Sequence, residues 1–325
     1  MADFSKSNSG TLITTVGEIL VEIMSLDVGN GFQECQQLRG PYASGAPAIF
    51  IDQVAMLGAN ASMVGAVGDD DFGKLSLSRL KHDGVDVSAV DIIQDKPTAI
   101  AFVRYQDDGE RNFLFTLEAS AATQIDAAGL LEHLEQTTHL HVVGSSMSMA
   151  TVADYIVSAI TQVKNNGGTV SFDPNVRPEI MQDAAMRDRL MHVLCQCDIF
   201  LPSAGELVHF CGTNNEQEAV EEVLSLGVSE VVLKKGSLGA AYYSADKCQE
   251  YDAFPVSQID PTGAGDCFGA TYVASRLQGN GVDQAMKLAC AAGALAVSHQ
   301  GPMEGNSTAT QLLDFIRNIE EAGKS

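Results

Sequence analysis

The segment IDPTGAGDCFGA (259–270) places an acid directly after a run of small residues. Gly263, Ala264 and Gly265 would expose backbone N–H groups at the start of a helix that the pattern predicts from about residue 266. Such a helix start binds anions, and small residues let a phosphate approach the backbone. Asp266 would face this site, poorly suited to bind phosphate but well suited to accept a proton from a hydroxyl that attacks it. The same position suits an acid that caps the first turn, so the residues alone leave both interpretations open.

A second glycine-rich segment, GDDDFGKL (68–75), has the glycine and lysine spacing of a phosphate-binding P-loop. Leu75 stands where the magnesium-binding Ser or Thr of a P-loop belongs, and three aspartates would repel phosphates. Acids near the start of a helix are favourable because they face the positive end of its dipole. The segment therefore predicts a turn that caps the next helix rather than a phosphate site.

Short apolar strands alternate with helical patterns along most of the chain, which predicts βαβ units around a buried parallel sheet. We expect a doubly wound α/β fold with helices on both faces and a site at the carboxyl ends of the strands. From residue 263 onward the pattern is almost wholly helical. The expected strands are 11–17, 61–68, 138–144, 168–174, 197–203 and 229–236, and the expected helices include about 47–58, 72–83 and 150–165.

Two segments, 18–43 and 96–118, break this alternation. The second contains two strand patterns joined by Asp107-Asp108-Gly109-Glu110, a hairpin signal. Hairpins inserted in an α/β unit predict a small antiparallel sheet that stands off the main one and acts as a lid. We expect one domain, 1–325, with these two segments as its β-lid.

Charge and composition exclude several classes of partner. The 325 residues hold 42 acids against 19 Lys and Arg, a formal charge of −23 that repels nucleic acid and anionic lipid. No long uncharged apolar run predicts a membrane span. Seven scattered cysteines form no zinc or disulfide pattern. We therefore expect a cytoplasmic protein with free thiols that binds neither nucleic acid nor membrane.

The chain resembles the ribokinase-like (PfkB) carbohydrate kinases over nearly its whole length. The resemblance rests on DPTGAGDCFGA together with motifs in family order: GEILVE (17–22), SGAPAIFIDQVAMLG (44–58), VGDDDFG (67–73), FDPNVR (172–177), PSAGEL (202–207), KKGSLGA (234–240) and an Ala-rich helix at 285–298. It implies an ATP- and Mg²⁺-dependent kinase that phosphorylates a primary hydroxyl of a free sugar. It also implies a homodimer formed through the β-lid.

The resemblance assigns roles to residues around the nucleotide. Asp266 matches the catalytic base, and Gly263, Ala264 and Gly265 match the anion hole that stabilises charge on the transferred phosphoryl group. Lys235, Gly236 and Gly239 match the turn that lines the ribose and phosphates of ATP, and Gly263 and Gly265 also count among the nucleotide-binding positions.

Two further acids have implied roles beside the phosphates. Glu206 matches the acid of an Asn-x-x-Glu motif that holds Mg²⁺ and its waters, although Ser203 replaces the Asn. Asp260 matches the leading acid of the signature, which organises the loop. The resemblance also implies a site for a monovalent cation such as K⁺ beside Asp260.

The sugar pocket departs from the family pattern at several positions. Gly45 and Ala46 lie in the motif that lines it, while Ser44 and Ile49 replace a Gly and an Asn of the family. Asp52, one helical turn after Ile49, is expected to take over the lost polar contact. The first-strand acid that grips sugar hydroxyls is Glu22 here, where many members have Asp.

The choice of sugar rests on one missing charge. Leu117 stands where the sugar-acid kinases, and several fructokinases, of the family have an arginine. A carboxylate substrate would lose a bidentate partner, which favours a neutral ketohexose such as tagatose or fructose. Arg104 and Arg177 could still supply positive charge to the substrate, so 2-keto-3-deoxygluconate stays an alternative. A sugar or nucleotide sensor that keeps the fold without turnover is the alternative from another class.

Overall fold

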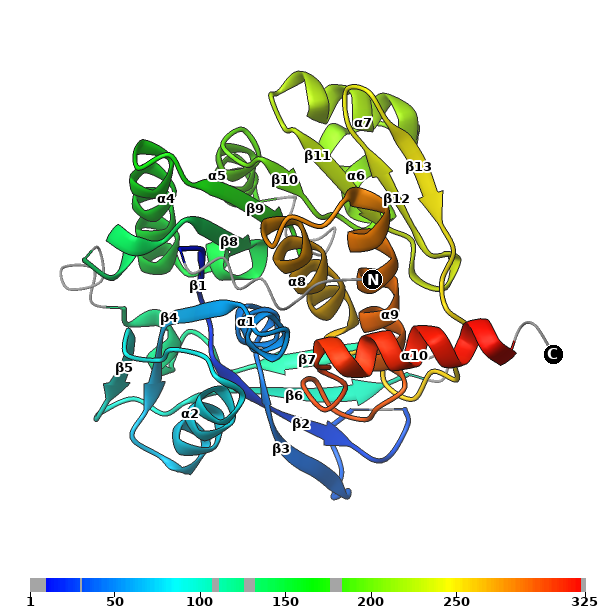
Figure 1. Ribbon diagram of the computed structural model, residues 1–325. Helices are drawn as coiled ribbons and strands as arrows, with labels where there is room; N and C mark the ends of the chain where they lie inside the picture. The colour runs from blue at the N-terminus through cyan, green and yellow to red at the C-terminus, as the bar shows by residue number, and fades with distance from the viewer. Residues whose placement is uncertain (1–9, 30, 107–110, 126–131, 176–182, 323–325) are drawn as a thin grey trace.

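The main sheet of the computed structural model has nine strands in the order β13-β12-β11-β10-β9-β8-β1-β4-β5 (Figure 1). The structure describes residues 10–29, 31–106, 111–125, 132–175 and 183–322. All neighbouring strands are parallel except β12, which is antiparallel to both β11 and β13. The strands are β1 Leu12–Val16, β4 Asn60–Gly68, β5 Val90–Ile93, β8 His139–Val143, β9 Thr169–Asp173, β10 Ile199–Phe200, β11 Glu230–Lys234, β12 Ala240–Tyr243 and β13 Cys248–Tyr251.

Helices cover both faces of this sheet, because its central strands are apolar on both sides. One face packs on α4 (Ala150–Asn165), α5 (Ala184–Leu194), α6 (Ala204–Cys211) and α7 (Glu216–Ser225). The other packs on α1 (Ala46–Met56), α2 (Asp71–Asp83), α8 (Ala264–Leu277), α9 (Val282–Val297) and α10 (Ala309–Ala322). The predicted doubly wound α/β fold is therefore confirmed. Within the described residues, no helix is both long and apolar enough to span a membrane.

A second sheet of four strands lies beside the main one, in the order β3-β2-β6-β7 (Figure 1). Its strands are β2 Leu20–Ser25, β3 Leu38–Ser44, β6 Ala99–Tyr105 and β7 Arg111–Phe115. Each hairpin is antiparallel, as expected, whereas the two hairpins are joined by the parallel pair β2 and β6. The expected hairpin turn at 107–110 lies outside the described residues. Movement of this sheet as a lid stays a prediction.

Alternation along the strands gives the small sheet two different faces. The pairing places Tyr105 and Arg111 opposite each other on one face and Phe102 and Leu114 on the other. Glu22 pairs with Ala101, which shares the face of Tyr105. The face that carries Glu22, Tyr105 and Arg111, here called the inner face, meets the loop that precedes α8. The opposite, outer face carries Phe102 and Leu114 beside Arg104.

The segment GDDDFG connects the main sheet to the small one. Asp70 is the N-cap of α2 and accepts a hydrogen bond from the Gly73 N–H at 2.8 Å. The same carboxylate accepts the backbone N–H and the hydroxyl of Thr98, both at 2.7 Å, and Thr98 directly precedes β6. The prediction of a helix-capping turn is confirmed, and this turn also anchors the start of a strand in the second sheet.

Candidate active site

The start of α8 is an open helix N-terminus built on a glycine. Gly263 is the N-cap, with φ at 78° and no side-chain cap. A Cβ there would lie 2.3 Å from the carbonyl oxygen of Pro302, so the close turn requires glycine. Ala264 and Gly265 then form the first turn, which leaves their N–H groups without helical partners.

Asp266 stands in this first turn but does not cap it. Among the described residues, none donates a hydrogen bond to its carboxylate, so the capping interpretation finds no support. Burial, followed by repulsion from Asp173, raises its pKa well above the ordinary value, while Lys234 and Arg111 act in the opposite direction. An acid in this setting is poised to hold a proton, which a general base must do after it accepts one.

A cavity of about 580 Å³ opens beside the start of α8. Its lining includes Gly236, Gly239, Ala264 and Gly265, which were predicted to meet ATP. Apolar residues from α9 and the 253–256 segment complete it, among them Phe254, Gly293 and Val297. A large, mainly apolar cavity that ends at a helix N-terminus is suited to a nucleotide, whose base would contact the apolar lining and whose phosphates would lie at the helix N-terminus.

Lys234, rather than the predicted Lys235, lines this cavity. The ammonium of Lys235 lies 2.9 Å from Glu216 and 3.0 Å from Glu250, away from the lining. Lys234 ends strand β11, and its Nζ lies 2.5 Å from Oδ2 of Asp173. The signal that could have found Lys234 is its place as the last residue of a parallel strand, where ligands bind in such sheets.

The inner face of the small sheet forms the other wall of the site. Glu22 is 2 % exposed, and Ser44 donates to its Oε2 at 3.3 Å, while no described residue donates to its Oε1. Burial and then repulsion from Asp260 raise the pKa of Glu22 to about 8, against an opposing effect of Arg111. A buried acid with a free oxygen on a cleft wall suits a ligand hydroxyl that donates to it.

Sequence reasoning missed two further residues on this wall. Arg111 donates from Nη1 to the Thr262 hydroxyl at 2.6 Å, and the Tyr105 hydroxyl donates to Asp260 at 3.2 Å. Both side chains reach from the small sheet to the loop before α8. Asp260 also accepts the Thr262 N–H at 3.0 Å and the Gly301 N–H at 3.1 Å, which is the geometry of a loop organiser.

Two predicted sugar contacts do not join this group. Asp52 has no exposed surface, and its carboxylate accepts from Asn306 at 2.6 Å and lies 3.4 Å from Arg79. No described residue donates to the Oδ1 atom of Asp52, and its contact with the sugar stays a prediction. Arg104 lies on the outer face of the small sheet, where it donates to the Gly29 carbonyl at 2.8 Å. Its strand position turns it away from Glu22, which corrects the expectation for Arg104.

The remaining predicted residues fall as follows. Gly45 is the N-cap of α1 with φ at 108°, and a Cβ there would lie 2.5 Å from the Glu18 carbonyl oxygen. Ala46 begins that helix. Arg177 lies outside the described residues.

Glu206 sits in the first turn of α6. Its carboxylate accepts the Ser203 N–H at 2.7 Å and the Ser203 hydroxyl accepts the Glu206 N–H at 3.4 Å, which is a capping box. The same carboxylate is close enough to Lys234 and Asp173 to raise the pKa of both. The Ser in place of the family's Asn therefore fixes Glu206 toward its own helix while leaving its charge beside Asp173.

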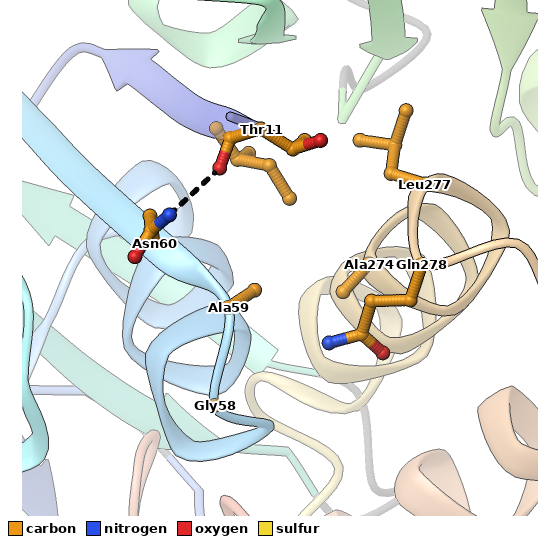
Figure 2. Close-up of a pocket in the computed structure, with 8 residues that line it drawn as sticks. Thr11, Gly58, Ala59, Asn60, Ala274, Leu277 and Gln278 are labelled. Atoms are coloured by element: carbon orange, nitrogen blue, oxygen red, sulfur yellow. Dashed lines mark hydrogen bonds between the residues drawn. The ribbon is translucent and has the colours of Figure 1, made fainter. Parts of the chain in front are cut away.

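A much smaller cavity lies at the amino ends of β1 and β4 (Figure 2). Asn60 donates to the Thr11 carbonyl at 3.1 Å at its edge, and Ala274, Leu277 and Gln278 of the α8 end face it across the gap (Figure 2). Its volume of about 20 Å³ is room for a single water. It is too small for a substrate, so the site beside α8 is the candidate.

Comparison with known proteins decides the family. A family model described as "pfkB family carbohydrate kinase" matches residues 11–309. The chain belongs to this family. A fructokinase of Salmonella typhimurium is 33% identical over 274 residues, which is 80% of this chain and 87% of that protein. The chain is thus a carbohydrate kinase of the pfkB family.

Two solved structures give the same result for the fold. An E. coli protein described under the name ribokinase II, in complex with ATP and Mg²⁺, is 41% identical with a TM-score of 0.88, covering 95% of this chain and 99% of its own. A fructokinase double mutant of Vibrio cholerae O395, in a form with fructose, ADP and potassium ion bound, is 25% identical with a TM-score of 0.80, covering 94% and 98%.

The residues of this pfkB kinase fit a magnesium ion beside the phosphates. Mg²⁺ binds through one or two carboxylates, several waters and the substrate phosphates. Glu206 supplies such a carboxylate in the first turn of α6, at the end of the sheet where Asp173 also lies. Within the described residues, no cluster of three metal-binding side chains is present.

Proposed function

We propose that this pfkB kinase transfers the γ-phosphoryl group of ATP to a primary hydroxyl of a neutral ketohexose, such as fructose or tagatose. The observation that carries the proposal is the position of Asp266. Its carboxylate receives no hydrogen bond from a described residue. It is close enough to Lys234, which lines the large cavity, and to Arg111 of the small sheet to be influenced by both charges. A base in this place can reach a hydroxyl on one side and a phosphoryl group on the other.

The nucleotide would occupy the cavity beside α8. The E. coli relative is described with ATP and Mg²⁺, and the cavity here has the lining of glycines and apolar residues that such a ligand needs. Glu206 would hold the Mg²⁺ through its waters. The ion would shield the negative charge of the phosphates. A monovalent cation beside Asp260 stays a prediction, which the potassium-bound form of the Vibrio protein supports.

In the transfer, the sugar hydroxyl attacks phosphorus in line with the departing ADP oxygen. Asp266 accepts the hydroxyl proton as the new bond forms. The N–H groups at the start of α8, through Gly265, stabilise the charge on the phosphoryl oxygens. Glu22 and Arg111 orient the sugar, and closure of the small sheet would exclude water and limit wasteful hydrolysis of ATP.

The charge on the sugar side favours a neutral substrate. Glu22 is repelled by both Asp260 and Glu304, and Arg111 is the cation that opposes this repulsion. A sugar carboxylate would add a further negative charge to this group. Arg111 is, however, the side chain that could take over the role lost at Leu117, so a sugar acid is the outcome to test against.

Coupled ADP release against a sugar panel tests the activity. We expect fructose or tagatose to give the highest kcat/KM, and a clear preference for 2-keto-3-deoxygluconate would overturn the neutral-sugar inference. If no sugar raises turnover above the ATP-only rate while calorimetry still detects sugar binding, the protein is a sensor. The intact Asp266 and its glycines argue against that alternative.

The base is tested with Asp266→Asn. The variant should bind ATP and sugar with roughly wild-type affinity while kcat falls by about 10²- to 10⁴-fold, the usual contribution of a general base. Near-normal kcat would refute the role of Asp266.

We also propose that two copies pair through the outer face of the small sheet. Phe102 and Leu114 lie opposite each other on that face, and Leu114 is 54 % exposed. Leu38 on β3, 45 % exposed, extends the same apolar surface. An apolar sheet face of this kind is typical of an interface between copies. A cytoplasmic location is consistent with ATP as substrate and with seven free cysteines.

A further inference from the structure

Lys234 occupies an unusual place at the end of the main sheet. It is the last residue of β11, and it reaches past the short strand β10 to Asp173, the last residue of β9. Its Nζ lies 2.5 Å from Oδ2 of Asp173, and the two side chains are 15 % and 3 % exposed. A buried ion pair of this kind is rarely kept for stability alone, because desolvation of both charges offsets their attraction.

The ammonium also faces the start of α8. A Cβ built on Gly265 would lie 3.5 Å from Nζ of Lys234, and both residues line the large cavity. The positive end of the helix and the lysine charge therefore point into the same space. Two independent sources of positive potential at one end of a nucleotide-sized cavity mark the place of a strongly negative group.

The surrounding acids make this cation necessary. Asp173 lies 2.5 Å from the Nζ of Lys234. Glu206, in the first turn of α6, and Asp266, in the first turn of α8, also act on the lysine. Without it, the carboxyl groups of Asp173, Glu206 and Asp266 would face the incoming triphosphate with no lysine charge among them.

We propose that Lys234 is a catalytic residue whose ammonium contacts the γ-phosphoryl group during transfer, and that Asp173 is the positioning residue that holds it beside the start of α8. This inference rests on the proposed kinase function. As the bond from phosphorus to the ADP oxygen breaks and the bond to the sugar oxygen forms, the hydroxyl proton passes to Asp266. Lys234 keeps its protons and neutralises charge on the phosphoryl oxygens.

The test compares Lys234→Met with Lys164→Met. Lys164 forms a partly buried pair with Asp198 at 2.8 Å, remote from the cavity lining, and is the matched control. We expect Lys234→Met to lower kcat by about 10²- to 10³-fold. It should also weaken ATP binding by about tenfold in calorimetry while ADP binding is unchanged, because ADP differs from ATP only in lacking the γ-phosphoryl group. Lys164→Met should leave all three values at wild-type level.

A double variant separates catalysis from stability. Lys234→Met alone leaves Asp173 buried without its partner, which destabilises the fold. Lys234→Met with Asp173→Asn removes both charges and should restore the melting temperature, whereas kcat and ATP affinity should stay low. Recovery of kcat together with stability would show a purely structural pair and overturn the proposal.

Two further outcomes decide the matter independently of the sugar. If Lys235→Met loses ATP affinity and Lys234→Met does not, the assignment to Lys234 is wrong. If the wild type phosphorylates no sugar but still loses ATP affinity selectively on Lys234→Met, the phosphate contact stands while the proposed kinase function fails. The binding measurement needs neither turnover nor sugar, so the two failures are distinguishable.

Discussion

Glu22→Gln should change how the stability of the protein depends on pH. The Glu22 carboxyl is 2 % exposed, and burial together with Asp260 raises its pKa from 4.5 to about 8. In the unfolded chain the acid loses its proton near pH 4.5, whereas in the folded chain it keeps the proton to about pH 8. Its contribution to stability is therefore fully present below pH 4.5 and is lost as pH rises to about 8. Glutamine has the same shape and does not titrate.

The size of the effect follows from the two pKa values. Raising a pKa from 4.5 to about 8 corresponds to about 5 kcal/mol of unfolding free energy. For a chain of this length that is on the order of 10 °C in Tm. Between pH 4.5 and 8 the unfolding free energy of the wild type should fall by this amount relative to that of Glu22→Gln. Above pH 8 the gap in unfolding free energy between the two proteins should be constant.

Thermal unfolding of both proteins without ligand, at steps between pH 4.5 and 9, measures the difference. Glu132→Gln, which removes an exposed acid on the surface, controls for the loss of one negative charge from a strongly acidic chain. It should not reproduce the change. Parallel Tm curves for the wild type and Glu22→Gln would refute the reasoning, because they would mean that Glu22 titrates alike in the folded and unfolded chains.

Three other variants test separate parts of the structure. Asp70→Ala removes the cap of α2 and both hydrogen bonds to Thr98. The free energy of unfolding should fall by about 2–3 kcal/mol, and amide hydrogen exchange in β6 should accelerate. Asp71→Ala, in the same turn, is the control, and equal effects of the two variants would contradict the anchoring role of Asp70. Arg111→Met should lower kcat/KM for the sugar by about 10- to 100-fold and leave ATP affinity unchanged. If only ATP affinity falls, Arg111 contacts the nucleotide and not the sugar. Leu114→Glu should convert a dimer into monomers in light scattering at unchanged Tm, and an unaltered mass would exclude the outer face as the interface.

Much of the fold could be predicted because periodicity and buried apolar runs depend on local sequence. The helices expected at about 47–58, 72–83 and 150–165 are α1, α2 and α4, with bounds shifted by two residues at most. The parallel pairing of β2 with β6 could not be predicted, since it joins segments that are about 80 residues apart and depends on how both leave the main sheet. The antiparallel edge formed by β12 and β13 was missed for a different reason, because each of these strands is only four residues long and gives little periodicity to detect.

The site shows where sequence reasoning reaches its limit. The glycines and Asp266 could be assigned to a helix start because their types and spacing determine it directly. Arg104 on β6 and Arg111 on β7 lie on opposite faces of the small sheet, and Lys234 ends β11 while Lys235 follows it. Only the assembled sheets show which of these side chains meets the site, because successive strand residues face opposite sides.

The two walls of the cleft come from different halves of the chain. Glu22, Tyr105 and Arg111 precede α4, whereas the nucleotide cavity is lined from Lys234 to Val297. Recombination at the start of α4 would therefore exchange one set of contacts as a block and leave the other intact. A chimera with a relative should take its sugar preference from one parent and its nucleotide preference from the other, provided that the core beneath α1 and α8, to which both halves contribute, still packs. In evolutionary terms, the sugar that accepts the phosphoryl group can change while ATP is kept as the phosphoryl donor.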